Sequence, residues 1–189
     1  GYFGNSGAEA NEAAIKLARK YGELNGGSKR KTIITLESSF HGRTLATLTA
    51  TGQNKFHPEC FAPYPEGFNT IKANDFESLE NAFDDTCAAL FMESIQGEGG
   101  VNLIDKEWAL AACEKARKAG AIVMIDEVQT GIGRTGSFLY SDSLGLNAEV
   151  VTLAKGIAGG LPMGACLFRG KAKDVFKAGD HQSTFAGNP

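Results

Sequence analysis

The sequence predicts an α/β fold of three layers (αβα), in which helices cover both faces of a mainly parallel β-sheet. Short apolar runs without polar alternation, at residues 88–92, 121–125 and 150–153, are typical of parallel strands buried on both faces. Helical patterns, such as the one at residues 106–119, alternate with these runs along the chain. Alternation of this kind indicates a parallel sheet between two layers of helices.

The chain of 189 residues has the length of one domain and is long enough for a substantial core. It begins with Gly1 and ends at Pro189 within a segment that looks ordered, so we expect a domain cut from a longer protein. Its 24 glycines are well above the roughly 7% of average proteins. Such a composition suits loops whose backbone approaches a ligand closely.

The charge and hydropathy of the chain indicate which kinds of binding partner are favoured. The formal net charge is −3 and no basic stripe stands out, so neither nucleic acid nor an anionic membrane surface is favoured. No apolar run approaches the roughly 20 residues of a membrane span, and we expect no membrane partner. Small-molecule chemistry is the favoured class of function.

The cysteines and histidines show no metal-binding pattern. The cysteines are widely spaced without a C-x-x-C pair, which indicates reduced core residues of a cytoplasmic protein: Cys60, Cys87, Cys113 and Cys166. The histidines His41, His57 and His181 have no ligand spacing with each other or with these cysteines. We therefore predict no metal site.

The first predicted elements are the end of a strand at Tyr2 and a helix that starts after Ser6. Small residues before a helix N-terminus can form an anion site, because unpaired backbone N–H groups and the positive end of the dipole converge there. A phosphate at Ser6, Gly7 and Ala8 is one interpretation. The other is an ordinary turn in which Ser6 caps the helix, and these residues alone favour it.

A second strand is predicted at residues 31–36, followed by Phe40, Arg43 and a helix through Thr49. Arg43 at the carboxyl end of a strand could bind a substrate carboxylate, with Phe40 as a stacking plate. The alternative is a surface arginine beside a core phenylalanine. Residues 51–64 carry glycine, proline and asparagine at turn-like intervals and indicate a long active-site loop.

Three further elements lead to the central strand. Asn74, with Glu77 three residues later, is predicted to cap a helix that ends at Phe83. The strand at residues 88–92 is followed by two acids and several glycines, which suggest one wall of a site. The helix at residues 106–119 is expected to stop at a glycine before the chain enters the central strand.

The central strand, residues 121–125, ends at Asp126 and Glu127, where ligands bind in open α/β sheets. A magnesium-side strand of a P-loop NTPase would require a G-x-x-x-x-G-K-[ST] loop, which is absent from the sequence. The segment from Gly131 to Gly136 matches G-x-G-x-x-G, but residues intervene between strand and turn. The third interpretation is that Asp126 pairs with the ring nitrogen of a cofactor whose aldehyde a lysine holds, as in pyridoxal phosphate (PLP) enzymes.

The lysine for that arrangement would be Lys155. It follows the predicted strand at residues 150–153 and precedes a glycine-rich turn, which is not the position of an ordinary solvated lysine. The alternative is an exposed lysine, which is the commoner case for a single residue of this type. A last strand is predicted at residues 164–168 and a short helix at residues 171–177.

Six segments occur together in the order of a known family: NSGAEANEAAIKLARK, FHGRT, ESIQGEGG, IDEVQTGIGRTG, TLAKGIAGGLPMGA and STFAGNP. The chain thus resembles the class-III PLP-dependent aminotransferases, and among them most closely the acetylornithine aminotransferases. The resemblance implies that residues 1–189 are the PLP-binding large domain of a fold-type-I PLP-dependent transferase. An N-terminal segment and a C-terminal small domain would then lie outside it.

The resemblance also implies roles for individual residues. Lys155 would bind PLP covalently and move a proton between substrate and cofactor, while Asp126 would keep the pyridine nitrogen protonated. Arg43 would bind the substrate α-carboxylate, and Glu98 would pair with a switching arginine outside this chain. The remaining implied cofactor contacts are Ser6, Gly7, Ala8, Phe40, Val128, Gln129 and Thr184, the last reaching the phosphate of a neighbouring subunit.

The implied reaction is transfer of the δ-amino group of N-acetylornithine to 2-oxoglutarate, by a cytoplasmic homodimer in arginine biosynthesis. Ornithine or 4-aminobutyrate is the alternative donor within the family. A different class, an NAD-dependent dehydrogenase, would bind its cofactor between Gly131 and Gly136. A non-catalytic scaffold of the same fold is disfavoured because Lys155 and Asp126 are both present. Ser94 and Gln182 depart from the family pattern, which more often has proline and glycine there.

Overall fold

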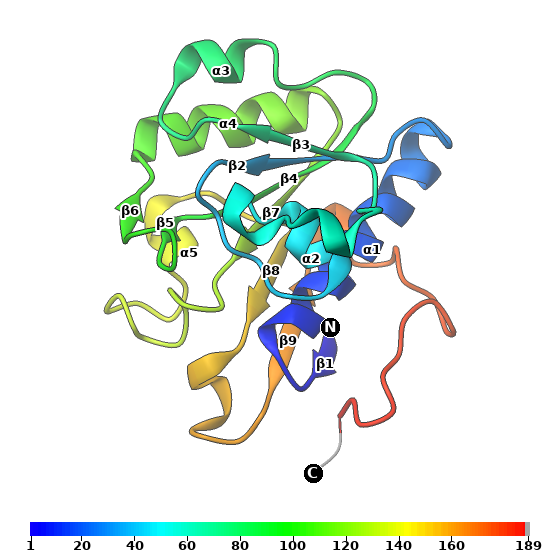
Figure 1. The fold of residues 1–189 in the computed structure, drawn as a ribbon, viewed down its shortest axis with the longest axis vertical. Helices are drawn as coiled ribbons and strands as arrows, with labels where there is room; N and C mark the ends of the chain where they lie inside the picture. Colours follow the sequence, from blue (N-terminus) through cyan, green and yellow to red (C-terminus); the bar gives the residue numbers. More distant parts are fainter. Residues whose placement is uncertain (188–189) are drawn as a thin grey trace.

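The computed structural model describes residues 1–187, and it contains a seven-stranded sheet with the strand order β1-β9-β8-β7-β4-β2-β3 (Figure 1). Neighbouring strands from β3 to β8 run parallel, whereas β9 is antiparallel to both β8 and β1. The strands are β1 Tyr2–Gly4, β2 Thr32–Leu36, β3 Phe68–Ile71, β4 Cys87–Glu93, β7 Ile122–Asp126, β8 Val150–Leu153 and β9 Gly164–Phe168. The predicted mainly parallel sheet is confirmed.

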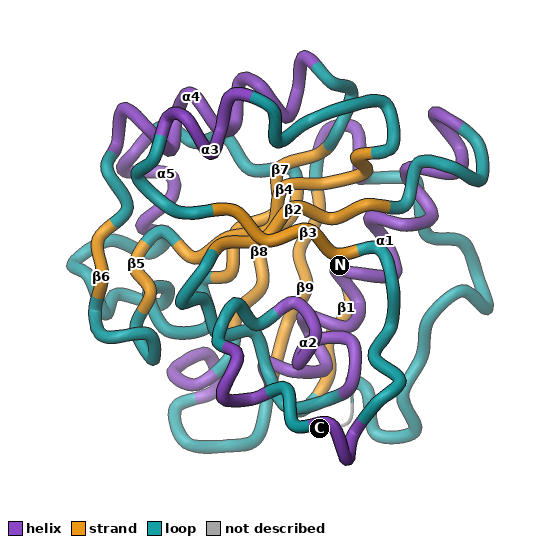
Figure 2. Tube along the Cα trace, turned by 45° about the horizontal axis from the view of Figure 1, so that its top comes forward, coloured by secondary structure: helices purple, strands orange, loops and turns teal. Residues whose placement is uncertain are grey.

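Helices cover both faces of this sheet, as Figure 2 shows. The long helix α1 (Gly7–Gly26) packs on one face, and α4 (Lys106–Lys118) with the short α3 (Phe76–Glu80) and α5 (Tyr140–Leu144) packs on the other. A short helix, α2 (Leu45–Ala50), contacts α1 near the sheet end that carries the pocket described below. The three-layer α/β prediction is therefore confirmed.

The central strands explain why both helix layers form. Along β7, Ile122 and Met124 belong to the apolar cluster under α1, whereas Val123 and Ile125 belong to the cluster under α4. Because successive side chains of a strand point to opposite faces, an unbroken apolar run requires cover on both sides. The apolar clusters on the two faces of the sheet therefore hold β7 in the middle of the molecule. Its carboxyl end is Asp126.

Smaller elements complete the chain. A two-stranded hairpin of β5 (Ile95–Gln96) and β6 (Asn102–Leu103) follows β4. Among the described residues, four 3₁₀ turns lie in loops, at Asn54–Phe56, Glu59–Phe61, Lys155–Ala158 and Gly170–Ala172. The first two fall in the loop predicted at residues 51–64. Within the described residues, no helix is both long enough and apolar enough to cross a membrane.

Four local predictions were wrong. Asp75, not Asn74, caps α3 by accepting hydrogen bonds from the backbone of Glu77 and Ser78, because Asn74 adopts a left-handed backbone with φ of 59°. The helix ends at Glu80 instead of Phe83. The helix predicted at residues 171–177 is only the turn Gly170–Ala172. Cys60 is exposed on its loop, whereas the other three cysteines are buried as expected.

Candidate active site

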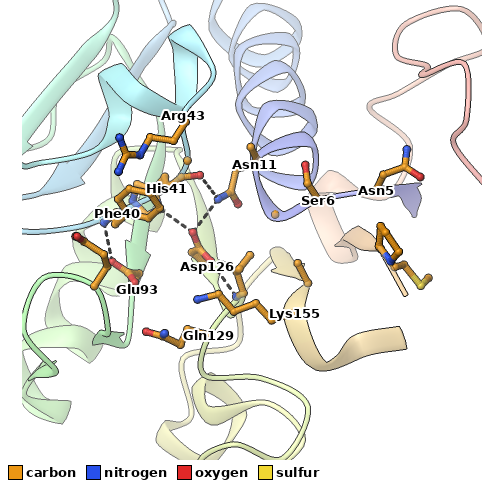
Figure 3. Close-up of a pocket in the computed structure, with 18 of the residues that line it drawn as sticks. Asn5, Ser6, Asn11, Phe40, His41, Arg43, Glu93, Asp126, Gln129 and Lys155 are labelled. Carbon is orange, nitrogen blue, oxygen red and sulfur yellow. Dashed lines mark hydrogen bonds and ion pairs between the residues drawn. The ribbon is translucent and has the colours of Figure 1, made fainter. Parts of the chain in front are cut away.

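A pocket of about 350 Å³ opens at the carboxyl ends of the parallel strands, where ligand sites of open α/β sheets lie. It gathers segments that are far apart in the sequence: the start of α1, the loop after β2, and the ends of β4, β7 and β8 (Figure 3). Nearly all the residues predicted for the site line it, namely Ser6, Gly7, Ala8, Phe40, Arg43, Glu98, Asp126, Val128, Gln129 and Lys155.

Asp126, the last residue of β7, is held by three hydrogen-bond donors. Its Oδ2 atom lies 2.8 Å from both Asn11 Nδ2 and His41 Nδ1, and its Oδ1 atom accepts the backbone N–H of Val128 at 2.9 Å. The residue is only 4% exposed. The carboxylate therefore has one orientation, fixed by α1, by the loop after β2 and by its own turn.

Sequence reasoning missed Asn11 and His41 as site residues. Asn11 Nδ2 also donates to the backbone oxygen of His41 at 2.7 Å, and the His41 ring stacks on Phe91 with centroids 4.0 Å apart. Asn11 Oδ1 and His41 Nε2 are buried and have no hydrogen-bond partner among the described residues. A signal did exist for Asn11, because a lone amide on the alanine-rich face of a buried helix requires a polar partner.

Lys155 begins the 3₁₀ turn after β8 and has a left-handed backbone, with φ of 50°. Its amino group points into the pocket on the side opposite α1, toward the space in front of Asp126 (Figure 3). Of the two alternatives for Lys155, the structure shows the exposed one. Its amine is thus accessible from the pocket and from solvent.

Phe40 and Arg43 lie together on the wall formed by the loop after β2. The Arg43 guanidinium lies 4.3 Å from the ring centroid of Phe56 and 5.5 Å from that of Phe40, which are cation–π distances. Phe56, from the loop predicted at residues 51–64, was not expected to take part. The two rings orient an exposed arginine whose guanidinium forms no hydrogen bond or ion pair within residues 1–187, so its donors can bind an anionic group.

Two glutamates have different environments in the pocket. Glu93, the last residue of β4, is 5% exposed and accepts the backbone N–H of Phe40 at 2.9 Å. Burial, and then the negative charge of Asp126, raises the pKa of Glu93 to about 8. Glu98 is more open, and it accepts a hydrogen bond from Gln53 and pairs with Lys55 at 3.8 Å. Glu98 is therefore already paired with a cation in this chain.

The start of α1 supports both interpretations of its small residues. Ser6 is the N-cap, and its Oγ atom accepts the backbone N–H of Glu9 at 3.1 Å, as the simple cap predicts. Ser6, Gly7 and Ala8 also line the pocket. A Cβ atom on Gly7 would lie 2.9 Å from a methyl group of Val128, so glycine is what allows the helix start to approach the end of β7.

Thr184 and the segment between Gly131 and Gly136 lie outside this pocket. Thr184 is exposed and does not line the pocket. The segment between Gly131 and Gly136 forms turns ahead of α5 and opens no helix, so it lacks the anion site of a dinucleotide fold. In the part of the chain that the structure describes, no group of three or more potential ligands is arranged to hold a metal ion.

Comparison with known proteins identifies the family. The model of the family described as aminotransferase class-III matches residues 2–189. The chain belongs to the class-III aminotransferases. Acetylornithine aminotransferases of Caldanaerobacter subterraneus subsp. tengcongensis and Wolinella succinogenes are 50% and 48% identical to it over 188 residues. These matches cover 100% and 99% of this chain but 47% of each relative, so the chain spans about half of their length.

Solved structures agree with this class-III assignment. The ornithine aminotransferase of Toxoplasma gondii ME49 superposes with a TM-score of 0.92 at 35% identity, covering 100% of this chain and 45% of its own. An (S)-enantioselective omega-transaminase of Thermomicrobium roseum superposes with a TM-score of 0.86 at 31% identity, covering 98% of this chain and 47% of its own. The fold is therefore that of the PLP-dependent transaminases.

Class-III aminotransferases use PLP, and the pocket fits this cofactor. The cofactor has a phosphate, a ring nitrogen that can be protonated, and an aldehyde. The N-terminus of the 20-residue helix α1 suits the phosphate, and the buried Asp126 carboxylate suits the protonated nitrogen. The accessible amine of Lys155 suits the aldehyde. These groups line one pocket.

Proposed function

We propose that this chain is the PLP-binding large domain of an aminotransferase that transfers the δ-amino group of N-acetylornithine to 2-oxoglutarate. The observation that carries the proposal is the amine of Lys155 in the same pocket as the buried, triply hydrogen-bonded Asp126 carboxylate. A lysine and a fixed carboxylate are the two groups that a PLP site requires. The assignment of 1–189 as one domain of a longer, homodimeric, cytoplasmic enzyme of arginine biosynthesis is part of this proposal.

The proposal gives each side of the pocket a role toward PLP. Asp126 would hold a proton at the ring nitrogen, Lys155 would bind the aldehyde carbon, and the backbone of Ser6, Gly7 and Ala8 would bind the phosphate. Phe40 and Val128 would pack against the ring, Gln129 would bind the phenolic oxygen, and Thr184 would bind the phosphate in a partner subunit. When bound, PLP supplies electron withdrawal from the carbon that carries the amino group.

The chain's own residues do the rest of the work. Lys155 would move the proton at the substrate carbon, since it lines the pocket that the substrate would enter. Arg43, stacked against Phe56, binds the α-carboxylate through two parallel hydrogen bonds. Glu98 is the partner of a second arginine outside this chain. Lys55 and Gln53 hold Glu98 in its present position until that arginine arrives.

The relatives favour N-acetylornithine as the amino donor. The acetylornithine aminotransferases are 46–50% identical to this chain, whereas the solved ornithine aminotransferase is 35% identical. Ornithine is therefore the second candidate. Nothing in the pocket favours 4-aminobutyrate, and the turn between Gly131 and Gly136 does not support a dehydrogenase.

The test uses the complete protein purified with PLP. N-acetylornithine, ornithine and 4-aminobutyrate are supplied separately with 2-oxoglutarate, and glutamate is measured. The proposal expects the largest kcat/KM with N-acetylornithine, and borohydride should fix the chromophore on the Lys155 peptide. A chromophore on another residue would overturn the site, whereas a larger kcat/KM with ornithine would overturn only the donor.

A further inference from the structure

Two buried carboxyl groups end neighbouring strands at the floor of the pocket. In the parallel pair of β4 and β7, Glu93 and Asp126 are partners in the register. They are 5% and 4% exposed. Two carboxylates so placed cannot both ionise without a large electrostatic cost, so one of them holds a proton.

The hydrogen bonds show which of the two is neutral. Asp126 receives two side-chain donors and one backbone donor, whereas Glu93 is bonded by the backbone of Phe40 and Gly97. The carboxyl that accepts fewer hydrogen bonds from donors, Glu93, is the easier of the two to protonate. Burial first, and the negative charge of Asp126 second, raises the pKa of Glu93 to about 8, so it is mostly protonated at pH 7.

Other charged groups around Glu93 come from each wall of the pocket. Lys155, just after the end of β8, is the cation that lowers the pKa of Glu93. Its effect does not cancel that of burial. The titratable groups that face this floor are His41, Arg43, Glu98, Asp126 and Lys155. Among residues 1–187, none of these groups forms an ion pair with Glu93, so its carboxyl can respond to an incoming charge.

The proposed function requires one pocket to admit two unlike ligands. An amino donor carries an ammonium group, whereas an oxo acid carries an uncharged carbonyl at the equivalent position. A permanently ionised carboxyl would favour the ammonium and disfavour the carbonyl oxygen. A carboxyl whose charge changes with the ligand suits both.

We propose that Glu93 is a charge-adjusting carboxyl, neutral in the pocket without an amine and ionised when the ammonium group of an amino donor binds. The O–H bond of Glu93 breaks, the electron pair stays on the carboxylate, and the proton passes to solvent. Binding of an oxo acid releases no proton. This inference rests on the proposed function, because it concerns how the same site recognises both substrates.

Thermodynamic linkage gives the direction of the pH effect. Because amine binding releases a proton, the affinity for the donor rises with pH while Glu93 is protonated, by up to about tenfold per pH unit. The affinity for the oxo acid lacks this dependence. The rise ends where Glu93 is already ionised, near pH 8.

The first measurement follows the ionisation of Glu93 directly, without turnover. The cofactor-free full-length protein is labelled with ¹³C at the glutamate carboxyl carbons, and the Glu93 signal is the one missing in Glu93→Gln. We expect Glu93 to titrate well above an ordinary glutamate, and Asp126→Asn to lower its midpoint. A Glu93 signal that is fully ionised at pH 7 in the wild type would overturn the inference.

The second measurement adds ligands at pH 7. N-acetyl-L-ornithine should shift the Glu93 signal to the ionised form, whereas N-acetyl-L-norvaline, which has the same chain without the amino group, should leave it unchanged. Equal responses to the two ligands, or no response to either, would contradict the inference. Glu37→Gln, which removes a carboxyl outside this pocket at the end of β2, is the control and should behave as the wild type.

Kinetics of the PLP-loaded enzyme separate this inference from the proposed function. Glu93→Gln should raise KM for N-acetylornithine more than KM for 2-oxoglutarate, and should flatten the pH dependence of the donor KM. Equal increases in both would count against a role in amine recognition. A wild-type enzyme that fails to transaminate would instead overturn the proposed function, while the carboxyl titration would still stand.

Discussion

Asp126 Oδ2 and His41 Nδ1 lie 2.8 Å apart, although 85 residues separate them in the sequence. The His41 ring is fixed by its stacking on Phe91 and is 2% exposed. A hydrogen bond to a charged group inside a protein is worth about 1.5–3 kcal/mol. His41 is therefore a positioning residue for the carboxylate that the proposed function assigns to the cofactor ring.

His41→Phe should isolate this hydrogen bond. The phenyl ring can keep the stacking on Phe91 but cannot donate to Asp126, so the carboxylate loses one of its three donors. We expect cofactor affinity to fall by about 10- to 100-fold, which corresponds to the free energy above. Titration of the cofactor-free protein with PLP, followed by absorbance, measures it. Asn11→Leu should act in the same direction, whereas an unchanged affinity in both variants would remove the network from cofactor binding.

The sequence was informative wherever the pattern was local. The apolar run at residues 121–125 predicted β7 (Ile122–Asp126) and its acidic end, because burial on both faces leaves no alternation. The prediction of a helix at residues 171–177 was wrong, because a short mixture of polar and apolar residues is compatible with either a helix or a series of turns. Asn74 and Asp75 are equally good capping residues, and only the backbone conformation of Asn74 separates them.

The site was predictable in its parts but not in its connections. Asp126 and Lys155 each follow a recognisable strand, so their place at one sheet edge could be inferred. The bond from Asn11 to Asp126 spans 115 residues, and no local pattern encodes it. The sequence left both a sheltered and an exposed Lys155 open, because this residue stands between a buried strand and a glycine-rich turn.

Lys155→Ala should leave the fold intact and remove covalent attachment of the cofactor. The residue is exposed, so its side chain contributes little to the core. We expect borohydride treatment to leave no chromophore on the protein after denaturation, and multiple turnover to be lost. Mass spectrometry of the peptide and a glutamate assay measure the two effects. Near wild-type turnover would rule out Lys155 as the attachment residue.

Arg43→Lys should weaken the binding of α-carboxylates. Lysine keeps the charge but cannot form two parallel hydrogen bonds or lie flat over the ring of Phe56. KM for amino acids should rise by about tenfold or more, and KM for simple ω-amines should rise much less. Phe56→Leu, which removes the supporting ring, should give a smaller rise with the same preference. Equal effects on both donor types would exclude Arg43 from carboxylate binding.

Glu93→Gln should change how stability depends on pH. The pKa of Glu93 is about 8 in the folded chain and near its usual 4.5 in the unfolded one. The folded state therefore binds the extra proton, and its stabilising effect is complete below pH 4.5 and lost as pH rises to about 8. Relative to the wild type, Glu93→Gln should gain stability across this window. Urea unfolding at pH 5 and pH 8.5 measures it, and a difference that does not change with pH would contradict the assignment.

Gly164→Ala should disturb the start of α1 from a distance. A Cβ atom on Gly164 in β9 would lie 2.0 Å from the backbone oxygen of Ser6, and a backbone atom cannot rotate away as a side chain can. Ser6 caps α1 and lines the pocket, so its displacement moves the proposed phosphate site. We expect a loss of about 1–3 kcal/mol in unfolding free energy and weaker binding of PLP.

Gly156→Ala is the matched comparison, because the nearest atoms to its Cβ belong to Ile132 at 3.8 Å, an ordinary contact distance. It should change stability by less than about 0.5 kcal/mol. Urea unfolding and titration with PLP measure both variants. The PLP titration tests the phosphate site separately from stability. If Gly164→Ala lowers stability but leaves PLP affinity unchanged, then the Ser6 backbone is not part of the phosphate site. If instead both glycines tolerate alanine equally, the close approach of β9 to Ser6 is not required for the fold.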